Sequence, residues 1–392
     1  MATSASKPIR KIINVVFLVR SLNIGGAERQ LETLIHGMDK TKYKMTVVCF
    51  YSGGKLQKNI EAAGVQVISL QKKSRWDLPV FFSQLITKIK ELQPDVLYAL
   101  LPVPNILSIL LKLFIPGLKV IFGVRASGLV LSNYDWTFRF SIWLEAFFSR
   151  WADCLIVNSK AGKEYCLDRG ISKKIIRVIP NGINSKTCKP DPEAGIQIRH
   201  EWRIPQTSLL IGIIGRVDPT KDYSTFLHAC SKLVEKQRFV RFVCVGDGQP
   251  EYREKMIQMS KACGLTDHMI WSPARNDMPA VYNALNICCS SSIYEGFPNV
   301  IGEAMATGIP CVVTDVGDSA DIVGDTGKVV PTGQPEVLAE ALQQLIDLPE
   351  EDRQALGALA RQRIEARYAV EKMVCETQKV FDQLMGMQRE TN

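Results

Sequence analysis

Short apolar runs rich in β-branched residues alternate with longer segments of helical pattern through most of this sequence of 392 residues. An apolar run of strand length, flanked by helices, is typical of a parallel strand that is buried on both faces. The first series of such runs lies at 13–19, 44–51, 65–70, 95–101, 119–126, 154–159 and 175–184. We therefore predict a doubly wound α/β domain with a Rossmann-like parallel sheet in the first half of the chain.

The alternation is interrupted at 185–208, a segment with three prolines and no clear period. A second series of apolar runs then follows at 209–217, 241–248, 269–274, 287–292, 310–317 and 327–331, with further helical patterns at about 335–347 and 351–387. We therefore expect two Rossmann-like domains that face a central cleft. The expected division is an N-terminal domain over 1–187, a linker with a short helix over 188–208, a C-terminal domain over 209–370, and a final helix over 371–392 that crosses back to the first domain.

Charge is distributed unevenly along the chain, although the formal net charge is only +8. Residues 1–200 contain 29 Lys and Arg against 14 Asp and Glu, whereas the rest of the chain contains 19 against 26. A basic first half suggests an anionic partner, such as a membrane surface, a phosphorylated acceptor or a nucleic acid. Because no RRM, KH or helix-turn-helix signature is present, we expect no nucleic-acid partner.

Two apolar segments raise the question of membrane contact. No run reaches the roughly 18–20 apolar residues that a membrane span needs. The segments at 101–116 and 129–151 either touch a bilayer surface or form amphipathic helices that face a core. The eleven cysteines form no CxxC pair, so we expect buried reduced thiols and a cytoplasmic protein, associated with the inner face of a membrane if either segment is exposed. The four histidines lie scattered, without the spacing of a metal site.

Glycine pairs follow two of the predicted strands, where ligands bind in open parallel sheets. Gly25 and Gly26 open the first helix, and their backbone amides can face a phosphate or a sugar. A tight turn would explain the same two glycines. Gly246 and Gly248 end a strand of the second domain and would allow a ligand to come close to the backbone there.

Two cations, Arg216 and Lys221, follow the first strand of the second domain within the motif GRVDPTK. A forked guanidinium and a compact ammonium on one turn can clamp a diphosphate and neutralise the charge that develops on it as it leaves. Two solvated cations on a loop would look the same in the sequence.

Two glutamates flank the start of a predicted helix in SSIYEGFPNVIGEA. Pro298 suits the first helical turn, so Glu295 precedes the helix and Glu303 lies about one turn inside it. A carboxylate beside the anion site of a helix N-terminus is unfavourable unless it accepts hydrogen bonds from neutral hydroxyls, which sugars offer. The spacing therefore suits a nucleotide sugar, with its phosphates along the amides of Asn299, Val300 and Ile301.

Together these motifs resemble the retaining, metal-independent GT-B glycosyltransferases. EGFPNVIGEA matches their E-x7-E motif, and GGAER, VIPNGIN, GRVDPTK and GDG occur in family order along nearly the whole chain. The resemblance implies the GT-B fold and a hexosyltransferase of the family 4, group 1 type. Such an enzyme would use a nucleotide-diphosphate sugar as its donor and a hydroxyl acceptor that is glycan or lipid-linked, as in polysaccharide or glycolipid biosynthesis. It would need no cofactor and no metal.

The resemblance also implies roles for individual residues. Arg216 and Lys221 would bind the donor diphosphate, Glu295 the transferred sugar and Glu303 the ribose, with Arg216, Lys221 and Glu295 as the catalytic set. Arg275 lies where the family holds the nucleotide base. The remaining donor-side candidates are Gly25, Gly26, Gly215, Gly246, Gly248, Phe297, Pro298, Asn299, Val300 and Ile301.

The acceptor side departs from the family pattern. Many members carry a histidine at the end of the fourth strand, where this sequence reads YALLPVPN. No histidine role carries over, and the polar candidates nearby are Tyr98, Asn105, Arg125 and Ser127.

Two other functions fit the same architecture. One is a nucleotide-sugar epimerase, which needs acid and base groups in the cleft and is mildly disfavoured by the few histidines. The other is a non-catalytic nucleotide-sugar-binding scaffold, which would not need to retain all four of the residues Arg216, Lys221, Glu295 and Glu303.

Overall fold

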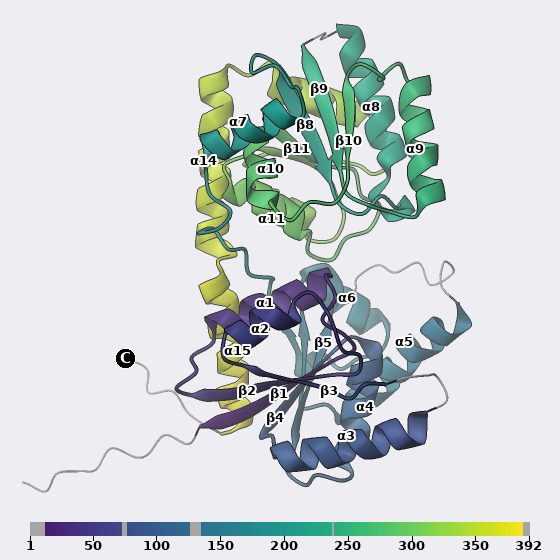
Figure 1. The fold of residues 1–392 in the computed structure, drawn as a ribbon, viewed down its shortest axis with the longest axis vertical. Helices are drawn as coiled ribbons and strands as arrows, with labels where there is room; N and C mark the ends of the chain where they lie inside the picture. Colours follow the sequence, from purple (N-terminus) through teal and green to yellow (C-terminus); the bar gives the residue numbers. More distant parts are fainter. Residues whose placement is uncertain (1–11, 73–76, 126–134, 237–238, 387–392) are drawn as a thin grey trace, which may run out of the picture.

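The computed structural model describes residues 12–72, 77–125, 135–236 and 239–386, and in these residues the chain forms two parallel sheets, one in each half (Figure 1). The first sheet has the strand order β3-β2-β1-β4-β5-β6-β7 and the second has the order β10-β9-β8-β11-β12-β13. All neighbouring strands pair in parallel. The predicted doubly wound α/β architecture of two Rossmann-like sheets is therefore confirmed.

The strands of the first sheet are β1 (Ile13–Val19), β2 (Tyr43–Cys49), β3 (Gln66–Ser69), β4 (Val96–Leu100), β5 (Lys119–Val124), β6 (Cys154–Val157) and β7 (Ile176–Val178). Those of the second sheet are β8 (Leu209–Ile214), β9 (Val240–Val245), β10 (Met269–Ser272), β11 (Ile287–Ser290), β12 (Cys311–Thr314) and β13 (Lys328–Val330). Each lies within one of the predicted apolar runs or begins one residue before it.

Both faces of each sheet are covered, which explains the unbroken apolar character of the strands. In β1, Val15 and Phe17 point into one buried cluster whereas Val16 and Leu18 point into the cluster on the opposite face. The first cluster is closed by α1 (Gly26–Gly37) and α2 (Gln57–Ala62), and the second by α3 (Leu78–Leu92), α4 (Pro102–Lys112) and α6 (Lys160–Asp168). Alternate side chains of one strand therefore belong to two different cores.

The second sheet is covered in the same way. One face is closed by α7 (Pro192–Glu201), α10 (Met278–Ala284), α11 (Asn299–Ala306), α12 (Ser319–Val323) and α14 (Glu350–Arg367). The other face is closed by α8 (Tyr223–Lys236), α9 (Pro250–Ala262) and α13 (Pro335–Ile346). The helix α7 lies inside the segment predicted as a linker, and it packs closely on α10: a Cβ added to Gly195 would lie 2.3 Å from the carbonyl oxygen of Asn283.

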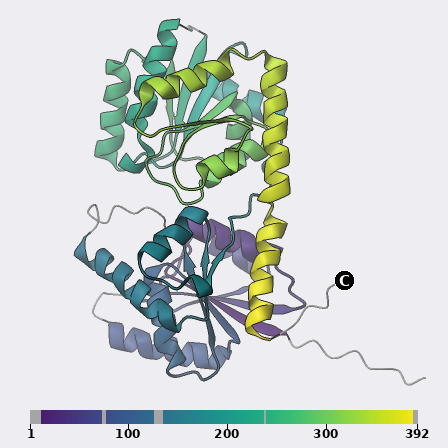
Figure 2. The same ribbon diagram turned by 180° about the vertical axis from the view of Figure 1, so that it is seen from behind.

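The last helical pattern, over 351–387, forms two helices, α14 and α15 (Val370–Leu384). The chain leaves helical geometry at Tyr368 and Ala369, where the Tyr368 carbonyl accepts a hydrogen bond of 2.8 Å from the amide of Ile183. The Tyr368 carbonyl thus finds its hydrogen-bond partner outside the helix, in a residue far away in the chain. The local sequence pattern gives no sign of this contact. Figures 1 and 2 show the two helices as one yellow column alongside both halves of the molecule.

The helix α15 packs on the first sheet rather than the second. Its side chains Met373, Val374, Val380 and Phe381 join the buried cluster that contains β1 and α1. The rings of Phe381 and Tyr43 meet edge to face at 5.9 Å. The end of the chain that follows the second sheet is thus anchored in the first domain.

Candidate active site

The candidate site lies on loops that follow the strands of the second sheet. The turn after β8 contains the short 3-10 helix Pro219–Lys221, and the loop after β11 leads into α11. The two loops are tied together, because the amide of Ile293 donates to the carbonyl of Thr220 at 2.8 Å. Carboxyl ends of parallel strands are the usual ligand site in such sheets.

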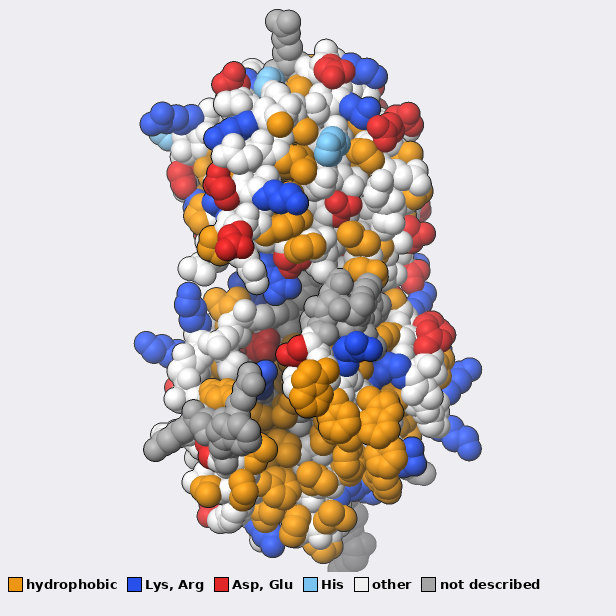
Figure 3. Space-filling view, turned by 90° about the vertical axis from the view of Figure 1, so that its right-hand side faces the viewer, with side chains coloured by type: hydrophobic (Ala, Val, Ile, Leu, Met, Phe, Trp, Pro, Cys, Tyr) orange, Lys and Arg blue, Asp and Glu red, His pale blue; other side chains and the backbone are white. Residues whose placement is uncertain are grey.

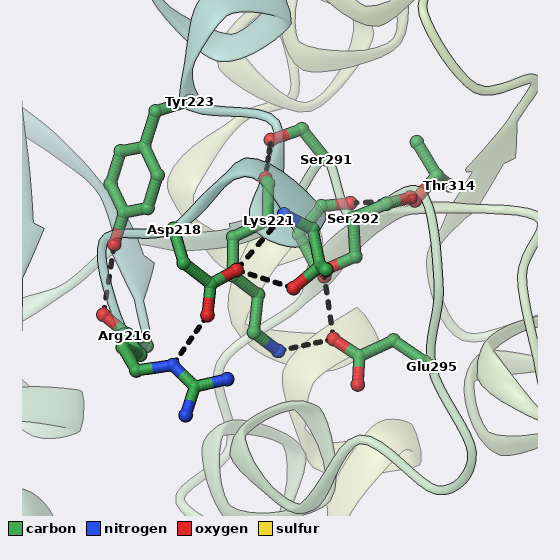
Figure 4. Close-up of polar contacts among 11 residues, drawn as sticks. Arg216, Asp218, Lys221, Tyr223, Ser291, Ser292, Glu295 and Thr314 are labelled. Carbon is green, nitrogen blue, oxygen red and sulfur yellow. Dashed lines mark hydrogen bonds and ion pairs between the residues drawn. The ribbon is translucent and has the colours of Figure 1, made fainter. Parts of the chain in front are cut away.

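Lys221 and Glu295 form an ion pair at the centre of these loops (Figure 4). Glu295 also accepts a hydrogen bond of 2.7 Å from the hydroxyl of Ser292. The hydroxyl of Ser291 donates to the carbonyls of Lys221 and Asp222, both at 2.9 Å. The cation and the carboxylate that sequence reasoning assigned to different parts of a ligand are therefore in direct contact.

Arg216 lies on the same turn and is far more exposed, with 76% of its side-chain surface accessible. Its Nε pairs with Asp218, whose carboxylate also caps the turn by accepting from the amide of Thr220 at 2.9 Å. Burial opposes ionisation of Asp218, but the hydrogen bonds from Thr220 and Arg216 outweigh it and lower the pKa of this carboxyl. In Figure 4 the ends of Arg216 and Lys221 extend to the same side of the turn, where a diphosphate could meet both.

Three glycines near this turn have a packing role. Gly215 and Gly246 both have φ +151. A Cβ on Gly246 would lie 2.0 Å from the carbonyl oxygen of Gly215, and a Cβ on Gly248 would lie 2.0 Å from that of Val217. The loops after β8 and β9 therefore touch each other, and this contact by itself requires glycine at 246 and 248.

The first turn of α11 offers fewer amides than the sequence suggested. The amide of Ile301 donates to the carbonyl of Pro298 at 3.1 Å, because the helix begins with a tight i to i+3 bond. We therefore withdraw Ile301 as an amide donor to a ligand and keep Asn299 and Val300. Phe297 is buried, and its ring packs on Tyr368 at 5.4 Å, so its contribution is to hold the loop.

Glu303 lies one turn into α11 and accepts a hydrogen bond of 2.6 Å from the hydroxyl of Tyr282. Burial raises the pKa of Glu303, while the hydrogen bond from Tyr282 and the charge of Arg29 act in the opposite direction. The side chain lines a cavity of about 770 Å³ that also touches Arg29 of α1 and Asn299 of α11. This cavity is not lined by Arg216, Lys221 or Glu295. Glu303 therefore occupies a different part of the region between the two sheets from the two cations Arg216 and Lys221.

The first domain meets this region at the start of α1. Gly25 is the N-cap of α1, and a Cβ added to Gly26 would lie 3.9 Å from the side-chain nitrogen of Asn299. Glu28 lies in the same turn, and burial raises the pKa of its carboxyl. The glycine turn of the first domain thus faces the N-terminus of α11, as a shared ligand site would require.

A polar chain crosses from the first domain to the second at this point. Arg125 donates to the hydroxyl of Tyr98 at 3.3 Å and to the side-chain oxygen of Asn181 at 2.9 Å. Asn181 in turn donates to the side-chain oxygen of Asn299 at 2.8 Å. Asn181 was missed as a site residue, although it lies in the quoted motif VIPNGIN.

One acceptor-side candidate, Asn105, lies away from this polar chain. Asn105 is fully buried, and its amide donates to Glu145 at 2.7 Å, beneath the helix α5 (Trp136–Phe148). Ser127 lies outside the described residues. We therefore leave Asn105 out of the acceptor site, because its side chain is fully buried inside the core.

Arg275 is engaged with α7 and its own loop. Its guanidinium contacts Glu201 at 2.5 and 3.0 Å and Asp277 at 2.8 and 2.7 Å, and it lies over the ring of Trp202 at 5.9 Å. Hydrogen bonds from Arg275 to Asp277 and Glu201 raise the pKa of the guanidinium further. The side chain is held by protein carboxylates, so any role in holding a base falls to the backbone of this loop.

A second interdomain contact lies at the loop after β12. The carboxylate of Asp318 accepts hydrogen bonds from the amides of Lys160 and Ala161, at 2.8 and 3.0 Å, at the N-terminus of α6. Lys160 also pairs with Asp321 at 2.6 Å. A carboxylate of the second domain thus caps a helix of the first.

Two family models match the chain, one in each half. The first is described as Glycosyltransferase Family 4 and matches residues 24–187. The second is described as Glycosyl transferases group 1 and matches residues 196–363.

Curated proteins with known names are similar to this chain at modest identity. The chain is 28% identical over 188 residues to a 2-deoxystreptamine glucosyltransferase of Streptomyces kanamyceticus, which covers 46% of this chain and 47% of that one. It is 27% identical over 184 residues to a UDP-Gal:alpha-D-GlcNAc-diphosphoundecaprenol alpha-1,3-galactosyltransferase of Escherichia coli, again over 46% and 47%. The chain therefore spans about half the length of these two relatives. A Campylobacter jejuni N-acetylgalactosaminyltransferase that extends a diphosphoundecaprenol-linked sugar is 25% identical over 364 residues, 90% of this chain and 94% of that one.

Solved structures share the whole architecture. HepE of Anabaena, in complex with UDP and glucose, has a TM-score of 0.84 at 20% identity, over 95% of this chain and 100% of that one. A sucrose-phosphate synthase of Thermosynechococcus elongatus has a TM-score of 0.80 at 19% identity, over 96% and 100%. At such identities the likeness establishes the fold.

Proposed function

The chain belongs to the group 1/family 4 glycosyltransferases and has their GT-B fold, and from this premise we propose that it is a retaining glycosyltransferase. It would transfer a sugar from a nucleotide-diphosphate sugar to a hydroxyl group of an acceptor. The observation that carries the proposal is the pairing of Lys221 with Glu295 where the loops after β8 and β11 meet. This pair offers a cation for a phosphate beside an acceptor for sugar hydroxyls.

For the donor, we infer a nucleotide-linked hexose, with a UDP-hexose as the first candidate. The Escherichia coli relative is named for UDP-Gal, and HepE has been crystallised with UDP-glucose. In this chain Glu303 would accept from ribose hydroxyls and Glu295 from hydroxyls of the transferred sugar. The amides of Asn299 and Val300 would lie toward the phosphates.

The proposed reaction breaks the bond between the sugar C1 and the phosphate oxygen, and forms a bond from C1 to the acceptor oxygen on the same face. The proton of the attacking hydroxyl passes to the leaving phosphate. Lys221 and Arg216 would stabilise the charge that develops on the nucleoside diphosphate, which is the task a divalent cation performs in other enzymes. The ion pair with Glu295 would hold the Lys221 ammonium at this site.

For the acceptor, we infer a glycan or a lipid-linked sugar. The Escherichia coli and Campylobacter jejuni relatives are both named for diphosphoundecaprenol-linked acceptors. The acceptor would enter beside the first domain, where Arg125 follows β5 and links the buried Tyr98 to Asn181. A role in polysaccharide or glycolipid biosynthesis follows from such an acceptor.

A thermal-shift screen against UDP-, GDP- and ADP-sugars tests the donor first, because a ligand of the native state raises the unfolding temperature. The nucleotide that gives the largest shift is then used in a transfer assay with chelator present. We expect nucleoside diphosphate to be released with an acceptor and the product to retain the anomeric configuration.

Incubation of the best donor without any acceptor separates the remaining functions. A new sugar epimer would identify an epimerase. Donor binding without either product would identify a non-catalytic binding protein. Loss of all transfer when the chelator is added would contradict the metal-independent part of the proposal.

A further inference from the structure

The helix α5 and the turn that follows it expose a continuous aromatic stripe on the first domain. Trp136, Phe140, Trp143, Phe147 and Trp151 recur at the spacing of one helix face. Their exposed fractions are 74%, 51%, 58%, 36% and 48%. We call these five residues the aromatic face. Exposed apolar groups in one contiguous patch are uncommon on a soluble protein and usually mark an interaction site.

The opposite side of α5 carries the packing of the helix. Ile142, Glu145 and the following Ser149 are buried, and Glu145 lies near Arg169 at 3.5 Å. The helix therefore rests on the domain through this side, and the aromatic face is not needed for the core. Of the two apolar segments singled out in the sequence, the first contains α4, which places Ile109 and Leu111 in the core. The second contains α5, whose aromatic face is exposed.

The rings of the aromatic face are already arranged side by side. Phe140 and Trp143 are stacked with centroids 5.8 Å apart and 16° between their planes, and Trp143 and Phe147 with 5.8 Å and 20°. Arg150 lies 4.2 Å from the ring of Phe147 and 5.4 Å from that of Trp151. Stacked rings are rigid, so ordering them against a surface costs little conformational entropy.

The charges around this face are basic. Between Trp136 and Trp151 the exposed charged side chains are Arg139 and Arg150, because Glu145 is buried. Asp135 stands at the N-cap and accepts from the amide of Phe138 at 2.8 Å. The first 200 residues as a whole carry 29 Lys and Arg against 14 Asp and Glu. Such a surface is complementary to anionic headgroups.

The apolar surface continues beyond α5. Figure 3 shows apolar side chains gathered over the first domain, the lower one in that view, with far fewer of them on the second. Leu78 and Val80 of α3 and Leu113 after α4 are also exposed, Leu113 at 77%. No helix among the described residues is long and apolar enough to cross a membrane. The surface is therefore suited to lie on a bilayer, with aromatic rings at the depth of the headgroups.

We propose that the aromatic face docks the protein on an anionic lipid bilayer, with Arg139 and Arg150 facing the headgroups. The helix α5 is the first described element after β5, whose end carries Arg125 in the polar chain between the domains. Docking through α5 would bring the part of the site that contains Arg125 to the level of the headgroups. The consequence that the acceptor is lipid-linked rests on the proposed function, whereas docking itself does not.

Flotation with vesicles tests the proposal on the full chain. Vesicles of phosphatidylcholine alone are compared with vesicles that contain about a third phosphatidylglycerol, at low and high salt. We expect binding to the anionic vesicles that weakens as salt rises. The double variant Phe140→Ala/Trp143→Ala should lose at least about tenfold in bound fraction at equal lipid, since two large apolar side chains no longer enter the interface.

Control variants on the second domain show whether a loss of vesicle binding is specific to the aromatic face. Phe239→Ala removes an aromatic that is 47% exposed on the second domain, and it should bind vesicles like the wild type. Arg150→Gln should lose several-fold on anionic vesicles at low salt and much less on neutral ones, whereas Lys255→Gln, an exposed cation of the second domain, should not. Donor-induced thermal shift should be unchanged in all four variants, so a failure of donor binding is recorded separately from a failure of docking.

Equal flotation of the Phe140→Ala/Trp143→Ala variant and the wild type would overturn the proposal. So would a wild-type dimer in solution that this variant dissociates, because the face would then be an interface between two copies. Binding that is unaffected by salt and by Arg150→Gln would remove the assignment of the two arginines to anionic headgroups.

Discussion

The two walls of the cleft hold their polar side chains in different ways. In the second domain, Lys221, Glu295 and Ser292 are joined within two short loops, and Glu303 is held by Tyr282 from a neighbouring helix. In the first domain, Arg125 is held by Tyr98 and by Asn181, which lie 27 and 56 residues away in the chain. The wall that we propose for the donor (the donor wall) therefore joins two loops that each carry a sequence motif, although 74 residues separate Lys221 from Glu295. On the wall that we propose for the acceptor (the acceptor wall), Tyr98 and Arg125 lie outside the motifs. Residues within a motif can be recognised in a sequence, whereas residues outside the motifs, and the contacts between two motifs, cannot.

The largest effect is expected on the donor wall, from Lys221→Ala. Removing one preorganised charge at a leaving group costs about 10²–10³-fold in turnover. Steady-state kinetics with the donor identified by thermal shift measures this loss. Lys232→Ala, a surface lysine that pairs with Glu336 at 3.1 Å, is the matched control and should retain activity. Near-normal turnover of the folded Lys221→Ala variant would disprove the assignment of a diphosphate clamp.

Glu295→Gln should lower turnover by about 10- to 100-fold and leave the affinity for free nucleoside diphosphate nearly unchanged. The reason is that Glu295 is proposed to contact the sugar, which free nucleotide lacks. Kinetics and calorimetric titration with the nucleotide measure the two quantities separately. A loss confined to nucleotide affinity would show that Glu295 acts only by holding Lys221.

Glu303→Gln, also on the donor wall, should lower nucleotide affinity more than turnover, the reverse of Glu295→Gln. We expect about a tenfold loss of affinity for nucleotide, because a charged acceptor for two ribose hydroxyls becomes a neutral one. Turnover at saturating donor should change less. Equal losses in Glu295→Gln and Glu303→Gln, all in nucleotide affinity, would contradict the division of roles between the two glutamates.

Asp318→Ala tests whether the two walls depend on each other. The variant loses the two hydrogen bonds that cap α6 across the domain boundary, at a cost of about 1–3 kcal/mol in the free energy of unfolding. We expect a lower unfolding temperature together with a several-fold weaker donor affinity. Asp325→Ala, at a side chain that is 92% exposed, is the control. Destabilisation with unchanged donor affinity would mean that this contact does not orient the site.

The smallest effect is expected from Tyr282→Phe, through the protonation of Glu303. Burial raises the pKa of Glu303, and the hydroxyl of Tyr282 partly offsets this, so the variant should raise the pKa further. Because the protonated form accepts hydrogen bonds less well, donor affinity should fall with decreasing pH, and the fall should begin at a higher pH in the variant. Nucleotide titrations over mildly acidic to neutral pH measure this.

The contribution of Glu303 to stability should change with pH in the opposite direction to donor affinity. A carboxyl whose pKa is higher in the folded state binds its proton more tightly there, so its contribution to the free energy of unfolding grows as pH falls and is lost as pH rises through the folded pKa. Parallel falls of stability and donor affinity at acid pH in the wild type would show that groups other than Glu303 dominate.

Much of the architecture was predictable because strand periodicity and motif chemistry are local. The buried strands, the helix start after Pro298 and the loop with Glu295 each depend on residues that are close in the chain. The direct pairing of Lys221 with Glu295 was not predictable, since 74 residues separate them. The motifs indicated which loops would meet, but not which side chains would touch.

The sequence by itself determined two parallel sheets, the order of their strands along the chain and the loops that carry the donor motifs. Only the tertiary structure decided which polar residues are available. Asn105 is buried by Glu145 from 40 residues away, Arg275 is held by Glu201 from 74 residues away, and the last helix is divided where Tyr368 pairs with Ile183. It also decided that α4 enters the core while α5 keeps its aromatic face outside. The physical reason is the same in each case, because burial and pairing depend on neighbours that the chain brings together only when it folds.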